Sequence, residues 1–62
     1  MKAKNYYHIL EIGNYGEIGY QGYEETMRLA TNKLVHLSNT FVNLHFEIYV
    51  SPTKDVPPII TV

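Results

Sequence analysis

The chain has 62 residues, of which 45% are hydrophobic and 18% are charged, and its formal net charge is −1. This length accommodates a single small soluble domain over residues 1–62, and a domain of that size is only marginally stable alone. The sequence has no cysteine, which excludes disulfides, thiolate metal sites and cysteine nucleophiles. The nearly balanced charge argues against a basic phosphate-binding face and against an acidic mimic of nucleic acid.

The N-terminal residues lack the pattern of a secretory signal. Lys2 and Lys4 are followed by polar and aromatic residues, and Glu11 appears before any hydrophobic segment develops. No apolar run approaches the roughly 18 residues that a transmembrane helix needs. We therefore expect a complete cytoplasmic protein that begins at Met1 and does not enter a membrane.

The first element expected is a β-strand over residues 5–12. Its sequence is rich in aromatic and branched residues, and Leu10 and Ile12 recur at a spacing of two, as in a half-buried strand. If these two side chains face the core, His8 and Tyr6 lie on the same side. The opposite side then carries Tyr7, Ile9 and Glu11.

Two copies of a hexapeptide follow, EIGNYG at 11–16 and EIGYQG at 17–22. Asn14 and Gly16 favour a turn between them, because glycine adopts positive φ without a steric penalty. This turn predicts a short second strand at 17–20 that folds back on the first. The alternative is an irregular loop, since glycines weaken a strand.

From Tyr23 the period changes to that of a helix. Apolar residues follow at a 4-3-4-3 spacing and share one helical stripe: Tyr23, Met27, Ala30, Leu34 and Leu37. Glu24 and Glu25 are expected in the first turn behind Gly22 as the N-cap, where carboxylates interact favourably with the helix dipole. The helix is expected to end near Asn39, which tolerates a left-handed conformation.

A long third strand is predicted over residues 40–51. Five apolar residues alternate on its core face: Val42, Leu44, Phe46, Ile48 and Val50. The other face is solvated or interfacial: Phe41, Asn43, His45, Glu47, Tyr49 and Ser51. The tail at 52–62 contains Pro57 and Pro58, which prevent a helix, and then four residues of high β-propensity. We expect this tail to pack as an edge strand or as an arm on a neighbouring chain, with a disordered end as the alternative.

Together these elements predict an α+β fold. It is a small ββαβ(β) two-layer sandwich, in which one helix packs on a mainly antiparallel three-stranded sheet. The right-handed crossover rule favours the strand order 2-1-3, with strands two and three parallel to each other. One face of the sheet is expected to remain uncovered.

No group of residues predicts catalysis, and we expect a non-enzymatic protein without metal or cofactor. The glycine series of the repeat matches no phosphate-binding motif, and nearby carboxylates oppose phosphate. His8, His36 and His45 lack metal-ligand spacing. Glu11 and Glu47 are expected to meet on the open sheet face, but so small a domain has little volume for a pocket that raises the pKa of a carboxylate.

The six tyrosines are the most unusual feature of the composition. Tyrosine offers contact area with little loss of rotamer entropy, and Tyr, Gly and Asn together are typical of adaptable binding loops. We therefore predict a partner-binding surface on the glycine-rich loop and the open sheet face: Tyr7, Tyr15, Tyr20, Tyr23, Phe41 and Tyr49. The alternative is that these side chains cover the rim of a small core.

The sequence therefore favours a protein-interaction module, or a small regulatory or inhibitory accessory protein, that binds another protein. The alternative function is a small homodimeric nucleic-acid-binding protein that stacks bases on the sheet aromatics. A homodimer is also expected, because the strand at 40–51 is longer than its neighbours and part of its edge would remain unpaired.

Overall fold

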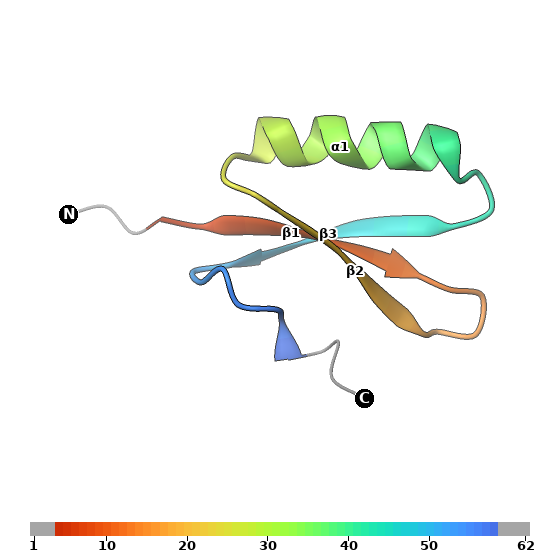
Figure 1. Ribbon diagram of the computed structural model, residues 1–62, viewed down its shortest axis with the longest axis horizontal. Coiled ribbons are helices and arrows are strands. Elements are labelled where there is room, and N and C mark those ends of the chain that lie inside the picture. Colours follow the sequence, from red (N-terminus) through yellow and green to blue (C-terminus); the bar gives the residue numbers. More distant parts are fainter. Residues whose placement is uncertain (1–3, 59–62) are drawn as a thin grey trace.

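The computed structural model describes residues 4–58, which form three strands and one helix. In chain order these are β1 (Tyr6–Ile12), β2 (Ile18–Glu24), α1 (Met27–Thr40) and β3 (His45–Ser51). The strands form one sheet in the order β2-β1-β3, with both outer strands antiparallel to β1, and α1 lies along one face of it (Figure 1). The predicted fold class, element order and strand order are therefore confirmed.

A tight turn at residues 13–17 joins β1 to β2. The amide of Gly16 donates to the carbonyl of Gly13 over 3.1 Å, and the amide of Gly13 donates to the carbonyl of Glu17 over 2.8 Å. Gly16 has a φ of 84°, in the left-handed region that favours glycine. The predicted turn is therefore confirmed, and the second strand is longer than expected, since it continues to Glu24.

A bulge in β2 decides which of its side chains share a face. Tyr23 pairs with His8, whereas Tyr20 pairs with Leu10, so β2 has one extra residue between these two pairs. Gly22 lies in the bulge with a φ of 105°. Tyr20 and Tyr23 consequently lie on the same side of the sheet, although regular alternation would separate them.

The helix α1 begins at Met27, with Thr26 as its N-cap. The Thr26 hydroxyl accepts a hydrogen bond from the amide of Leu29 over 3.2 Å and so satisfies one of the free amides of the first turn. The helix ends at Thr40, and Phe41 is its C-cap. Within residues 4–58, no helix has the length and apolar character needed to cross a bilayer.

The start of the helix differs from the sequence-based prediction. Tyr23 and Glu24 belong to β2, and Glu25 lies in the connection that follows it. The predictions that Gly22 caps the helix and that Tyr23 begins its apolar stripe are therefore wrong. The reason is that pairing with β1 continues to Glu24, so the chain leaves the sheet only just before the Thr26 cap.

The core lies between α1 and the sheet. Its buried members are Ile9, Ala30 and Phe46. Partly buried side chains pack around them: Tyr7, Leu34, Leu37, Leu44 and Ile48. The central residues of the predicted helical stripe and of the predicted alternating face are thereby confirmed. Residues at the ends of both patterns are exposed instead: Met27, Val42 and Val50.

The predicted faces of β1 are inverted. Ile9 and Tyr7 face the helix, while His8 and Leu10 face the opposite side of the sheet. Ile9 and Leu10 are both buried, so both faces of this strand are covered. An adjacent apolar pair that is buried on both faces has no alternation, and a period of two cannot choose between the faces.

The third strand is shorter than predicted and begins at His45. A turn precedes it, in which the amide of Leu44 donates to the carbonyl of Phe41 over 3.1 Å. β3 has 7 residues, as β1 and β2 have, and it pairs with β1 along its whole length. The expectation that this strand extends beyond its neighbours is therefore wrong.

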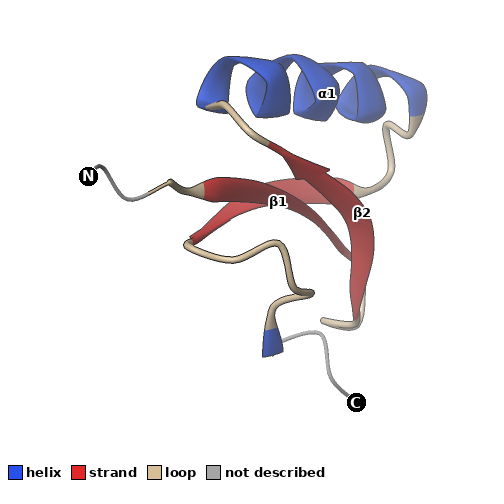
Figure 2. Ribbon diagram, turned by 60° about the vertical axis from the view of Figure 1, so that its left-hand side comes forward, coloured by secondary structure: helices blue, strands red, loops and turns tan. Residues whose placement is uncertain are grey.

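The residues after β3 return across the sheet on the side opposite α1 (Figure 2). In this C-terminal segment, residues 52–58, the carbonyl of Thr53 lies 2.9 Å from Nε2 of His8, and Pro57 is fully buried. The segment forms no strand, and it covers part of the face that was expected to be uncovered. The part of the predicted edge strand or dimer arm at residues 59–62 lies outside the described residues.

Candidate functional site

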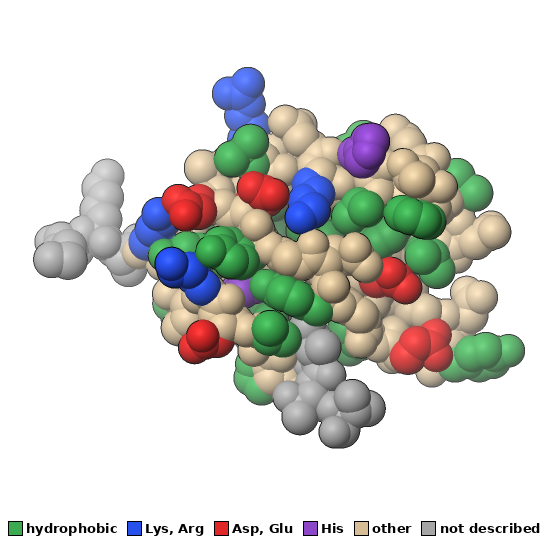
Figure 3. All heavy atoms as spheres, viewed as in Figure 1, with side chains coloured by type: hydrophobic (Ala, Val, Ile, Leu, Met, Phe, Trp, Pro, Cys, Tyr) green, Lys and Arg blue, Asp and Glu red, His purple; other side chains and the backbone are tan. Residues whose placement is uncertain are grey.

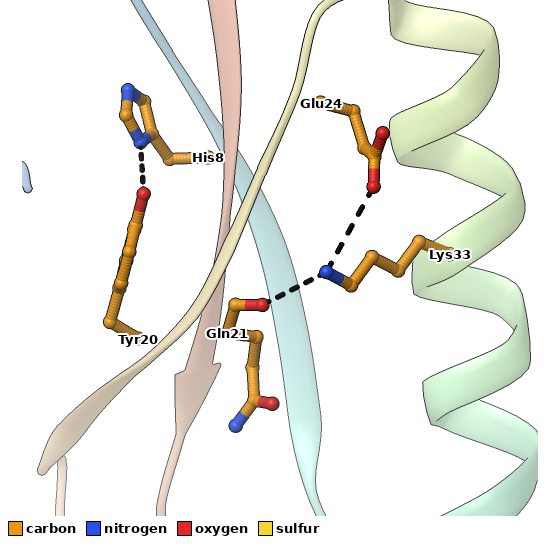
Figure 4. Close-up of polar contacts among 5 residues, drawn as sticks. All are labelled: His8, Tyr20, Gln21, Glu24 and Lys33. Atoms are coloured by element: carbon orange, nitrogen blue, oxygen red, sulfur yellow. Dashed lines mark hydrogen bonds and ion pairs between the residues drawn. The ribbon is translucent and has the colours of Figure 1, made fainter. Parts of the chain in front are cut away.

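His8 lies at the centre of the sheet face opposite α1, and its imidazole is fully buried. Its Nδ1 is 2.7 Å from the hydroxyl of Tyr20 (Figure 4), and its Nε2 is 2.9 Å from the carbonyl of Thr53. Because a carbonyl oxygen only accepts, Nε2 carries a proton and donates to Thr53. In the neutral ring, Nδ1 then accepts from the Tyr20 hydroxyl. The imidazole thereby joins β1, β2 and the C-terminal segment.

Tyrosine rings surround this imidazole. The ring centroid of His8 lies 5.7 Å from that of Tyr20, 5.8 Å from that of Tyr23 and 6.4 Å from that of Tyr49. The ring of Tyr6 stands edge-on to that of Tyr23, with 5.5 Å between the centroids and an interplanar angle of 87°. Aromatic pairs prefer this arrangement. We name these five residues, Tyr6, His8, Tyr20, Tyr23 and Tyr49, the aromatic cluster.

The strand register brings the aromatic cluster together. His8 pairs directly with Tyr23 on β2 and with Tyr49 on β3. Tyr20 joins them because the bulge at Gly22 places it on the same side as Tyr23. The glycine inside an otherwise β-prone stretch is the signal of a bulge, and it was available in the sequence.

An ion pair borders the aromatic cluster. Nζ of Lys4 lies 2.7 Å from Oε1 of Glu25 and 5.5 Å from the ring centroid of Tyr6. The hydrogen bond from the Lys4 ammonium lowers the pKa of Glu25, and the same bond raises the pKa of Lys4. Both side chains are exposed, so this pair adds little to stability. Inside the cluster, burial raises the pKa of Tyr20, and the neighbouring Tyr23 adds to this effect.

Tyr15 projects from the tip of the β1–β2 hairpin and is 94% exposed. The two backbone hydrogen bonds of the turn hold its position, and the Glu17 carboxylate accepts from the Tyr15 amide over 3.3 Å. Tyr15 is thus a free aromatic side chain on a well-defined backbone.

The predicted binding residues occupy separate regions. Tyr20, Tyr23 and Tyr49 meet on the face opposite α1, and Tyr15 stands at the hairpin tip. Tyr7 was placed on the open face, which is wrong, because it packs against the core under α1. Phe41 is the C-cap of α1 and therefore not a strand residue, and its side chain is half exposed. The six predicted binding residues therefore do not lie on one surface.

Polar side chains occupy the helix side of β2. Nζ of Lys33 donates to the carbonyl of Gln21 over 3.0 Å and lies 3.9 Å from the Glu24 carboxylate (Figure 4). The Gln21 side chain donates to the Glu11 carboxylate over 2.8 Å. The expected meeting of Glu11 and Glu47 is wrong, because Glu11 lies on the helix side and Glu47 pairs with Leu10 on the other face.

The histidines are separated in the described part of the chain. His8 lies on β1, whereas His45 lies on β3 opposite Ile12, at the other end of β1. His36 lies on the exposed side of α1. His45 instead contacts Glu47, with 2.8 Å between Nε2 and Oε2. No group of three His, Asp or Glu side chains close enough to share a metal ion occurs within residues 4–58, and no pocket is present in that range.

The hairpin glycines do not form an anion cradle. A Cβ built at Gly13 would overlap the Glu17 carboxylate, so a negative group already occupies the space beside this backbone. The face of the molecule seen in Figure 3 carries acidic and basic side chains interspersed with hydrophobic ones, as the balanced composition predicts. The chain matches no protein-family model, and searches of curated proteins and of solved structures found no significant match.

Proposed function

We propose that this protein is a non-enzymatic protein-interaction module, a small regulatory or inhibitory accessory protein that binds another protein through the tip of its β1–β2 hairpin. The observation that carries this proposal is the 94% exposure of Tyr15 on a turn held by backbone hydrogen bonds. A large exposed aromatic side chain on a fixed backbone loses little entropy when it is buried by a partner.

The aromatic cluster supplies a second part of the binding surface. Tyr49 is exposed at its rim, while Tyr20 and Tyr23 are half-buried. Their rings are held by contacts with His8, so the cluster presents a rigid surface. Rigid aromatic residues of this kind are enriched among the residues that contribute most to protein–protein affinity.

The charges of this chain fit a protein partner better than a nucleic acid. Lys4 lies beside the aromatic cluster, but its ammonium already binds the Glu25 carboxylate. The net charge of −1 provides no excess of positive charge for phosphates. Binding of single-stranded nucleic acid by base stacking is the alternative function, and the experiment below separates the two.

The test is capture of partners from native lysate with tagged protein at several salt concentrations. We expect capture of protein that changes little with salt, and its loss in Tyr15→Ser with an unchanged melting temperature. Val42→Ser is the matched control, since it also removes a highly exposed apolar side chain but lies outside the hairpin. Unchanged capture by Tyr15→Ser would contradict the proposal. Recovery of nucleic acid that dissociates steeply with salt would favour the alternative.

We place this module in the cytoplasm as part of the same proposal. Fractionation of cells that express the untagged chain would test this location.

A further inference from the structure

The two edge strands of the sheet, β2 and β3, differ in how far they are protected against pairing with another chain. On β2, the bulge at Gly22 interrupts the strand, and Lys33 donates to the backbone carbonyl of Gln21. Bulges and lysines are the devices by which proteins block the pairing of an edge strand with another chain. β3 has neither within His45–Ser51, and its register with β1 is uninterrupted. Among residues 4–58, no strand pairs with the outer edge of β3, so within this range that edge is open to a further strand.

Exposed apolar side chains accompany this open edge. Met27 and Val35 on α1 are 47% and 49% exposed, and Val50 on the helix side of β3 is 46% exposed. Lys33 reaches β2, so its side of the helix faces that strand. At about 100° per residue, Met27 and Val35 project from the other side of α1, toward the β3 edge. We name Met27, Val35 and Val50 the apolar margin.

We infer that a second copy of this chain pairs with the free edge of β3, so that two molecules form a continuous six-stranded sheet. A twofold axis perpendicular to the sheet reverses the strand direction and keeps the two faces, which gives an antiparallel β3–β3 pair with both helices on one side. This inference goes beyond the proposed function, since the hairpin tip lies at the end of the strands and stays free.

The register of this pair follows from symmetry and charge. In an antiparallel pair, side chains directly opposite each other lie on the same face of the sheet. The twofold axis keeps each face, so opposite residues are an even number of positions apart in the sequence. The residue at the axis therefore lies opposite its own copy. Only an axis at Ile48 pairs all 7 residues of β3. An axis at Glu47 would place two carboxylates opposite each other, which is unfavourable. The resulting pairs are His45 with Ser51, Phe46 with Val50, and Glu47 with Tyr49.

The position of the helices explains why the partner at the β3 edge is a second copy of this chain rather than a single strand from another protein. α1 packs mainly on β3 and thus lies close to the new interface. Adjacent strands are about 4.8 Å apart and packed helices about 8–10 Å apart, so the two copies of α1 would meet side by side over the paired edges. A second copy supplies a strand and a helix together, and the helix buries the apolar margin that an added strand alone would leave in water.

The first test measures mass by sedimentation across the micromolar range. We expect the chain to approach twice 7.2 kDa. Met27→Lys and Val50→Lys should each return it to one chain. Leu29→Lys is the matched control, because Leu29 is 50% exposed but lies on the β2 side of α1, and it should keep the dimer. A single-chain mass for the parent, or equal loss in Met27→Lys and Leu29→Lys, would overturn the inference.

The second test measures the register. The chain has no native cysteine, so single substitutions report one contact each. Glu47→Cys and Tyr49→Cys lie on the exposed face, and the register places each opposite the other in the partner chain, within the reach of a disulfide. An equal mixture of the two variants should cross-link faster than either variant alone. Equal rates in the mixture and in the separate variants would exclude this register and the edge pairing. The hairpin proposal would survive either result and fails only in the capture experiment.

Discussion

The phenol of Tyr20 and the imidazole of His8 are joined by a 2.7 Å hydrogen bond between neighbouring strands. His8 is fully buried, so its Nδ1 has no access to water once the C-terminal segment covers the ring. Tyr20 is therefore a structural partner of His8, and any part that it takes in binding is limited to the half-exposed remainder of its ring.

Tyr20→Phe removes the hydroxyl that donates to His8 and leaves the ring in place. We expect the free energy of unfolding to fall by about 1–3 kcal/mol, because a buried acceptor then lacks a donor. Urea unfolding followed by circular dichroism measures this change. Tyr23→Phe is the control, since the Tyr23 ring lies 5.8 Å from that of His8 but its hydroxyl takes no part in the two imidazole hydrogen bonds. Equal loss in both variants would contradict the assigned bond.

Alkaline pH should destabilise the fold through the same residue. Burial and the nearby Tyr23 raise the pKa of Tyr20 above its ordinary value of 10.0. The folded state then holds the phenol proton more tightly than the unfolded state does, so the free energy of unfolding falls as pH rises above 10. Urea titrations on both sides of this pH should show the decline, and Tyr20→Phe should show a smaller one. An identical decline in the variant would disprove this assignment.

Phe46→Ala should unfold a large fraction of the molecules. Phe46 is one of the three buried residues between α1 and the sheet, and such truncations typically cost about 3–5 kcal/mol. That loss is comparable to the whole stability of a domain of this size. Thermal denaturation measures it, with Val42→Ala as an exposed control that should melt within a few degrees of the parent. If Phe46→Ala also melts there, the helix-on-sheet core is wrong.

Gly22→Ala should destabilise the protein while Gly19→Ala should not. Gly22 has a φ of 105°, which an alanine adopts at a cost of about 1–2 kcal/mol. The added Cβ would also lie 3.2 Å from Nζ of Lys33, whose side chain can move away. At Gly19 the added Cβ would meet the Cβ of Glu11 at 3.7 Å, an ordinary contact. The midpoint of urea unfolding distinguishes the two, and equal midpoints would argue against the bulge.

The elements with one buried face could be predicted from the sequence. The stripe at Ala30, Leu34 and Leu37 and the alternation at Phe46 and Ile48 both face a single core, so their periods identify the helix and the third strand. The sequence does not define their boundaries, because the same spacings continue past the element ends, as Tyr23 shows for α1.

The face of β1 and the aromatic cluster could not be predicted in the same way. Ile9 and Leu10 are buried on opposite faces, so the local sequence carries no alternation. The burial of His8 depends on Thr53, which contacts it from a segment whose sequence has no strand or helix period. The grouping of Tyr20 with Tyr23 depends on a bulge, which shifts the alternation by one residue.

The contact between His8 and the C-terminal segment affects the order of folding during synthesis. His8 and Thr53 are 45 residues apart in the chain, and the pairing of Tyr6 with Ser51 spans the same separation, so both contacts share the entropy cost of closing one long loop. A nascent chain can form the β1–β2 hairpin early, but His8 stays in water until the segment after β3 has left the ribosome. The hairpin therefore waits with both of its faces in water, and its buried contacts form only after β3 and residues 52–58 have emerged.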